Sequence, residues 1–226
     1  MDLLLKYASE LMQGAVVTLQ LALTSLILGL LLGLALSACK LSRNAPIRLV
    51  VSGFTNLLRG VPEFLIILIC YFGLTNLINE HFDGALEISP FVGGVFALVV
   101  VFSAYASEVF RAALVAVPIG QIEAAKTCGL SNHQVFFLIQ LPQAWRNCLP
   151  SLNNLWQSLL KDTSLVSVLG LEDLLKKADM AAQYTKQPFL FFVAVAGVYF
   201  LFLALSEPIF MRLEEHANRG YAPLKP

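Results

Sequence analysis

Long uncharged apolar runs recur along the chain and give the first prediction of its architecture. The clearest run covers 14–38 and holds no charged residue. A helix needs about 20 predominantly apolar residues to cross hydrocarbon about 30 Å thick. We interpret five stretches in this way, and they cover about 14–38, 61–79, 91–113, 136–169 and 188–210. The pattern therefore predicts an all-α, polytopic membrane protein with five transmembrane helices in a single domain over 1–226.

The charges between the predicted spans indicate which side of the membrane each loop occupies. Three basic residues and no acid follow the first span, namely Lys40, Arg43 and Arg48. Three acids and neither Lys nor Arg follow the second span, namely Glu80, Asp83 and Glu87. Because Lys and Arg concentrate in cytoplasmic loops, we expect the first loop and the C-terminus inside and the N-terminus outside. The less apolar stretch 45–58 is expected to form an interfacial or partly inserted helix.

Composition agrees with a membrane protein and argues against other classes. Hydrophobic residues make up 58% of the chain and charged residues 13%, and the mean hydropathy is +0.74, outside the usual range of soluble domains. Basic and acidic residues number 15 each, so no net field attracts nucleic acid. The four cysteines lack CxxC spacing and predict buried free thiols, and the three histidines lie in different loops, so we expect no metal site.

The predicted cytoplasmic segment between the third and fourth spans has a distinctive spacing. Glu123, Ala124 and Ala125 precede Gly129, and Leu-Pro with Pro142 and a later Pro150 follow. This order predicts a short helix that stops at the glycine, followed by a second helix that enters the membrane. An ordinary cytoplasmic helix hairpin would explain the helices alone.

The same spacing resembles the EAA loop of binding-protein-dependent ABC importers. The resemblance implies a type I ABC importer permease fold, with a coupling helix at about 119–131 that docks into a separate ATPase subunit. By resemblance, Glu123, Ala124, Ala125 and Gly129 carry that docking role. The permease would bind no cofactor itself and would have no catalytic residue, because the ATPase subunit uses the ATP.

Three further motifs narrow the resemblance to the permeases of polar amino acids. Arg59, Gly60, Pro62 and Glu63 look like that group's Arg-Gly-x-Pro motif, and 104–111 resembles its third-span pattern. The stretch 161–167 resembles its fourth-span pattern. The chain looks most like the arginine-uptake permease, although it keeps the Glu-Ala-Ala wording that this permease tends to lose. The resemblance implies import of basic amino acids, arginine first and histidine, lysine or ornithine next, with glutamine, glutamate or opines as the alternative.

The predicted fourth span carries a polar face. Asn154, Gln157, Ser158 and Lys161 lie at helical spacing, and Asp162 follows Ser158 by four residues. Hydrogen bonding between helices explains the two amides, and Lys161 could neutralise Asp162. An ionisable residue beside a span usually faces a cavity or a partner, so Asp162 is our candidate contact for a cationic substrate. Further candidate contacts are the hydroxyls of Ser158, Thr163 and Ser164.

Other charged residues are expected to be structural. Glu108 and Arg111 lie three apart on one helix and should pair. Arg59 should anchor to phosphate headgroups or cap a neighbouring helix, with Glu63 as its partner in the chain. A membrane-embedded enzyme is the competing class, but no HExxH, GxSxG or paired intramembrane Asp occurs.

The family resemblance also implies partners and a location. These are the ATPase subunits, a second permease copy or homologous permease, a periplasmic or extracellular binding protein and the amino acid. The location implied is the bacterial cytoplasmic (inner) membrane, and nucleic acid is not expected as a partner.

Overall fold

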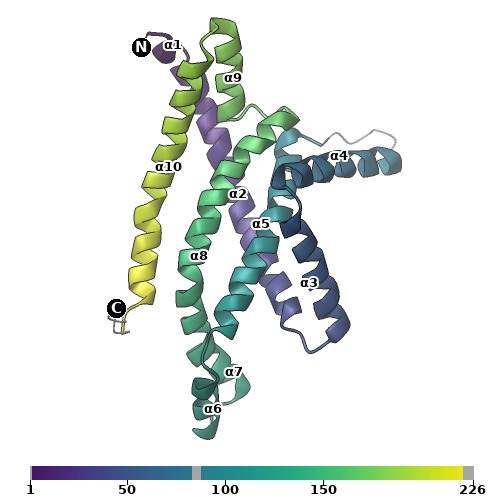
Figure 1. Cartoon of the computed structure of the whole chain (residues 1–226), viewed down its shortest axis with the longest axis vertical. Helices are drawn as coiled ribbons and strands as arrows, with labels where there is room; N and C mark the ends of the chain where they lie inside the picture. The colour runs from purple at the N-terminus through teal and green to yellow at the C-terminus, as the bar shows by residue number, and fades with distance from the viewer. Residues whose placement is uncertain (1, 83–87, 221–226) are drawn as a thin grey trace.

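The computed structural model describes residues 2–82 and 88–220, and these residues form helices and connecting turns without a strand. Figure 1 shows long helices that run along one direction, with α4 projecting sideways and α6 and α7 at one end. The elements in chain order are α1 (Asp2–Lys6), α2 (Ala8–Lys40), α3 (Ala45–Gly60), α4 (Glu63–Phe82), α5 (Pro90–Val115), α6 (Ile119–Thr127), α7 (Asn132–Val135), the π-helical turn η1 (Phe136–Gln140), α8 (Leu141–Asp162), the 3-10 segment η2 (Thr163–Leu169), α9 (Leu174–Thr185) and α10 (Pro188–Ala217). The all-α prediction is confirmed.

The helix pair α2 and α5 forms the centre of the fold. Two glycines on α2 permit a close approach, because a methyl group added at Gly33 would lie 2.8 Å from the Cβ of Ala106. One added at Gly29 would lie 2.5 Å from the ring of Phe102. Helices in lipid associate by close packing, because no hydrophobic force drives them together, and small residues at the interface let the backbones approach. The largest buried cluster surrounds this contact and draws on α2, α4, α5, α8 and η2.

A sharp bend separates α3 from α4. Val61 is extended, with φ −103° and ψ 142°, because a residue that precedes proline is disfavoured in the helical region. The carbonyl of Pro62 then accepts hydrogen bonds from the backbone N–H of Leu65 at 3.0 Å and Ile66 at 3.2 Å, which starts α4 at Glu63. The helix expected at 45–58 is therefore present as α3, and the helix expected from 61 begins two residues later.

Four described helices are long and apolar enough to cross a membrane, and they cover Ala8–Lys40, Glu63–Glu80, Pro90–Val115 and Pro188–Ala217. The stretch 136–169, predicted as a further span, is divided into η1, α8 and η2. The helix α8 buries one face, which includes Leu152, Trp156 and Leu160, and carries polar residues elsewhere. Because α8 is not among the four apolar helices, the count of five spans stays a prediction.

The cysteine prediction holds only in part. All four cysteines are free thiols. Cys148 is buried on α8, whereas Cys39 and Cys70 are half-buried. Cys128 is exposed, so the expectation of a buried thiol is wrong there. Its position explains the difference, because it follows directly after α6 at an exposed end of the molecule (Figure 1).

Candidate functional site

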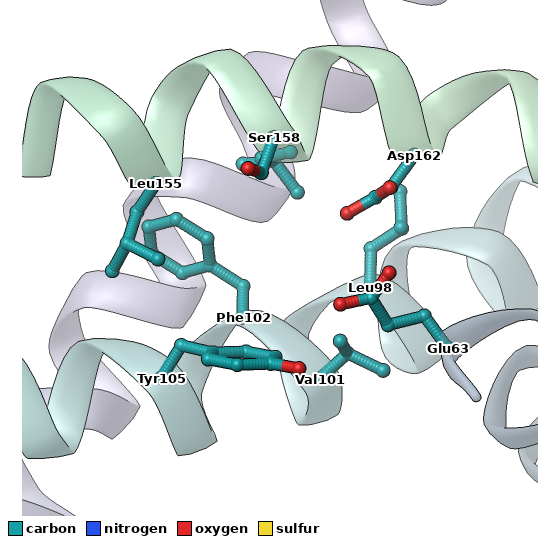
Figure 2. A pocket seen from close by; sticks show the side chains of 9 residues that line it. Glu63, Leu98, Val101, Phe102, Tyr105, Leu155, Ser158 and Asp162 are labelled. Atoms are coloured by element: carbon teal, nitrogen blue, oxygen red, sulfur yellow. The ribbon is translucent and has the colours of Figure 1, made fainter. Parts of the chain in front are cut away.

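A small pocket with mostly apolar walls lies between α4, α5 and α8, and Figure 2 shows the side chains that surround it. Its lining residues are Glu63, Leu98, Val101, Phe102, Tyr105, Leu155, Ser158, Leu159 and Asp162. The cavity holds about 60 Å³, which is room for a few water molecules. An amino acid side chain would therefore enter only after the surrounding helices separate.

Two carboxylates face this pocket from different helices. Glu63 is the first residue of α4 and Asp162 is the last residue of α8. In Figure 2 both carboxylates, together with the hydroxyls of Tyr105 and Ser158, lie around one space. No ion pair within the described part of the chain includes Glu63 or Asp162. Two acids without a cation in an apolar-walled pocket repel each other, and a cationic ligand would relieve that repulsion and donate charge-assisted hydrogen bonds to the carboxylates.

The structure brings together only some of the residues that the sequence placed at this site. Ser158 and Asp162 both line the pocket, and their contact with a substrate stays a prediction. Thr163 is buried elsewhere, where its hydroxyl donates to the carbonyl of Leu160 at 2.6 Å and lies 3.3 Å from the hydroxyl of Tyr199 on α10. The hydroxyl of Ser164 donates to the carbonyl of Lys161 at 2.7 Å. The change from α-helix to 3-10 helix after Asp162 turns these two hydroxyls to their own backbone, so neither lines this pocket.

The sequence predicted a partner for Glu63 that the structure does not show. Glu63 lies four residues from Arg59, and this spacing led to the expected pairing. The described residues contain no ion pair between the two, because the bend at Val61 and Pro62 separates the helices that carry them. The guanidinium of Arg59 instead lies over the ring of Tyr105, 5.6 Å from its centroid. In the sequence, Tyr105 was noted only as part of the motif at 104–111 and was not predicted to line a site.

The opposite side of α8 contacts α10 through amide side chains. The amide nitrogen of Asn153 donates to the carboxylate of Glu207 at 3.3 and 3.4 Å, and that of Gln157 reaches the same group at 3.5 Å. The predicted hydrogen bonding between helices is thus confirmed for Gln157. Asn154 is exposed, and its neighbour Asn153 makes the contact that was expected of it.

A second charged cluster joins α2 to α5. Glu108 accepts from Arg111 Nε at 3.0 Å, so the predicted pair is confirmed. Lys40, at the end of α2, donates to the other carboxylate oxygen of Glu108 at 3.1 Å. Lys40 is only 4% exposed, so Glu108 supplies the charge that such a buried ammonium group requires. Local spacing could not predict this contact, because the two residues are 68 positions apart.

The helix α6 forms a rigid projection at one end of the molecule (Figure 1). Gly129 adopts φ +85°, and its N–H donates to the carbonyl of Lys126 while Leu130 N–H donates to Ala125. This pair of bonds is the Schellman motif that ends helices at glycine, so the predicted stop is confirmed. Glu123 and Ala124 are exposed, whereas Ala125 is buried. Of the Glu-Ala-Ala motif, only the first two residues are therefore accessible at the surface.

A hydrogen bond connects α6 to the start of α8. The amide nitrogen of Gln143 donates to the side-chain oxygen of Gln121 at 2.6 Å and to the carbonyl of Ile139 at 2.9 Å. Pro142 stands in the first turn of α8, where its missing N–H costs little. The projecting helix and the helix that carries Asp162 are thus joined directly.

Comparison with known sequences gives a consistent result. A family model described as binding-protein-dependent transport system inner membrane component matches residues 25–217. The histidine/lysine/arginine/ornithine transport system permease protein of Salmonella typhimurium is 39% identical over 218 residues, with 95% of this chain and 96% of that protein covered. The arginine ABC transporter permease protein of Escherichia coli is 36% identical over 223 residues, with 91% and 94% covered.

Comparison with solved structures agrees with the sequence relatives. A chain in a crystal structure of an amino acid ABC transporter with histidines superposes with a TM-score of 0.84 at 32% identity. The match covers 94% of this chain and 96% of that one. Similarity over almost the whole length means that the relatives and this chain share one architecture.

Proposed function

This chain belongs to the family of binding-protein-dependent transport system inner membrane components, and on that premise we propose that it imports basic amino acids. Arginine is the first candidate substrate, and histidine, lysine and ornithine follow. The observation that carries this specificity is the pocket in which Glu63 and Asp162 face one cavity without a cation. A carboxylate pair suits a guanidinium or ammonium group and disfavours glutamate. The names of the two relatives support the same substrate class.

The permease subunit catalyses no covalent chemistry, because separate ATPase subunits hydrolyse the ATP. Two ATPase subunits would bind at the α6 end, and a binding protein would deliver substrate at the opposite, N-terminal end. The pore would be completed by a second permease, either another copy or a homologue. In this assembly the N-terminus lies outside and the C-terminus lies in the cytoplasm, in keeping with Lys40, Arg43 and Arg48 in the first loop.

Transport would proceed by alternating access, in which rigid parts rock around the substrate site. Movement of the ATPase pair would displace α6 through Glu123 and Ala124. The bond between Gln121 and Gln143 would pass that displacement to α8, which carries Asp162 at its far end. The cavity must widen from about 60 Å³ to admit a substrate, and a shift of α8 away from α4 would separate its two acids.

Uptake into proteoliposomes tests the substrate class. The transporter would be reconstituted with its ATPase and binding protein, and uptake of arginine and glutamine compared for Asp162→Asn and the parent chain. Loss of a charge-assisted hydrogen bond costs about 1.5–3 kcal/mol, so arginine uptake at limiting concentration should fall about 10- to 100-fold. Asp179→Asn, on α9 and outside this pocket, is the matched control and should leave uptake unchanged. Equal uptake of both amino acids by all three chains would move specificity to the binding protein.

A further inference from the structure

A second cavity, distinct from the pocket at Asp162, lies where α2 ends beside α3 and α5. It holds about 260 Å³ and is lined by Lys40, Arg48, Ser52, Asn56, Glu108 and Arg111. Three of these side chains are cationic and one is a carboxylate, which leaves two positive charges in excess. Every lining residue is polar or charged, unlike the walls of the first pocket.

The helix α3 supplies one wall of this cavity and has two contrasting faces. Arg48, Ser52 and Asn56 lie four residues apart, so they form one polar stripe that faces the cavity. The apolar residues between them are exposed, with Leu49 at 77% and Val50 at 68% of their free surface. An amphipathic helix with a basic polar face and an exposed apolar face is suited to the boundary between lipid headgroups and acyl chains.

The hydrogen-bonding groups in the cavity are mostly donors. Glu108 is already shared by Lys40 and Arg111. Within the described residues Arg48 has no carboxylate partner, and its guanidinium donates to the carbonyl of Ser42 at 3.3 Å. The Ser52 hydroxyl and the Asn56 amide add two neutral donors. An oxyanion would match this arrangement, since its oxygens accept from several donors at once and offset the excess charge.

We propose that this cavity binds the phosphate of an anionic phospholipid, with the acyl chains lying along the exposed apolar face of α3. Basic pockets between helices at the cytoplasmic side of a membrane are the usual sites for such headgroups. The cavity fits this location, because the end of α2 and the start of α3 lie toward the end of the molecule that carries α6 (Figure 1). The proposal does not depend on which amino acid is transported.

Lipid binding by the full transporter, with its ATPase, tests the proposal. The complex would be placed in nanodiscs of phosphatidylcholine with increasing phosphatidylglycerol, and retained lipid would be measured by native mass spectrometry. Arg48→Gln should weaken retention of phosphatidylglycerol at least about fivefold, since a basic residue near anionic lipid contributes about 1 kcal/mol. Arg43→Gln removes an equal charge from a nearby position just before α3 but lies outside the cavity, so it should have little effect. Both arginines are exposed, so neither change should prevent folding.

Each result bears on the assignment. Preference for phosphatidylglycerol that Arg48→Gln abolishes and Arg43→Gln preserves supports a headgroup site. Displacement of that lipid by millimolar inorganic phosphate would keep the oxyanion site and reassign its source to free phosphate. Equal retention of both lipids by the parent chain, or equal weakening by both variants, would overturn the proposal. Amino acid uptake is not measured, so failure here leaves the transport proposal intact, and failure of transport leaves this one intact.

Discussion

Two carboxylate sites lie one helical turn apart along α5 and differ in how their charge is balanced. Near Glu108, two cations contact one carboxylate, and Lys40 is buried against it. Near Tyr105, the carboxylates of Glu63 and Asp162 share a pocket, and neither forms an ion pair with a described residue. Paired charges hold two helices together, whereas unpaired carboxylates leave a charge for a ligand to satisfy. The difference supports our proposal that the second site holds a cationic substrate, whereas the first site joins two helices.

The largest effect is expected from disrupting the paired charges at Glu108. Glu108→Gln would leave the Lys40 ammonium buried without a carboxylate, and removing one partner of a buried pair costs about 3–5 kcal/mol. We therefore expect a marked fall in the free energy of unfolding, measured by denaturation of the purified protein in detergent. Glu80→Gln, at an exposed position on α4, is the control and should leave stability unchanged. Unchanged stability in Glu108→Gln would remove the structural role.

The next largest effect is expected at the pocket of Glu63 and Asp162, where a substitution should change transport and not stability. Glu63→Gln would lower arginine uptake about tenfold or more, because it removes one of the two charges that attract the substrate. Its thermal stability should match or exceed that of the parent, since two facing acids repel each other. Combination with Asp162→Asn should cost less than the sum of the single changes, as expected of residues that contact one ligand. A loss of stability comparable to that of Glu108→Gln would contradict the comparison.

A third prediction concerns Glu123, the exposed acid on α6, which belongs to neither of these two sites. Glu123→Lys should weaken docking of the ATPase about tenfold and reduce transport, while membrane insertion stays normal. Cys128 offers the measurement, because its exposed thiol should react with a maleimide and should be protected when the ATPase binds. Glu215→Lys, an exposed acid near the end of α10, is the control. Full protection of Cys128 in the Glu123→Lys chain would disprove the docking role.

The smallest effect is a pH dependence of stability at a further acid, Asp173, which lies outside the predicted spans. Asp173 caps α9 by accepting from the N–H of Lys176 at 2.9 Å, and its other carboxylate oxygen is buried without a partner. Burial raises the pKa of Asp173 to about 6, although the hydrogen bond from Lys176 lowers it. A raised carboxyl pKa favours the protonated form, so its contribution to stability is complete below pH about 4 and is lost as the pH rises through about 6.

Lowering the pH from 7 to 5 should therefore stabilise the protein by about 1 kcal/mol through Asp173 alone. Denaturation curves at both pH values would measure the change. Asp173→Asn keeps a cap acceptor and has no charge to titrate, so its stability should not show this increment. An identical pH dependence in the parent and Asp173→Asn would assign the effect to other groups.

Sequence patterns recovered features that depend on neighbouring residues. The apolar runs located the long helices, Gly129 marked the end of α6, and the spacing of Glu108 and Arg111 gave their pairing. Asp162 was found because it ends a polar face on a helix that would otherwise be apolar. Each of these signals comes from residues within a single helix or directly beside its end.

Features that depend on the meeting of distant segments were missed. Glu63 was assigned to Arg59, its neighbour in the chain, because nothing local indicates that the bend at Pro62 directs it toward α8. The contact of Asn153 with Glu207 joins residues 54 positions apart, and no period along α8 distinguishes it from Asn154. Thr163 and Ser164 were placed at the site because their hydroxyls follow Asp162 directly in the chain, but the 3-10 segment that begins there directs both hydroxyls to backbone carbonyls.

The glycines at the contact of α2 and α5 also constrain the mechanics of the transporter. Since Gly33 and Gly29 leave no room for even a methyl group against Ala106 and Phe102, the two helices are closely packed, and close packing resists relative movement. They should move as one rigid unit during the transport cycle. The cavity must then open by movement of the surrounding segments, above all the bend before Glu63 and the first turns of α8. The distance between one probe on α2 and one on α5 should stay almost constant while the rest of the subunit moves.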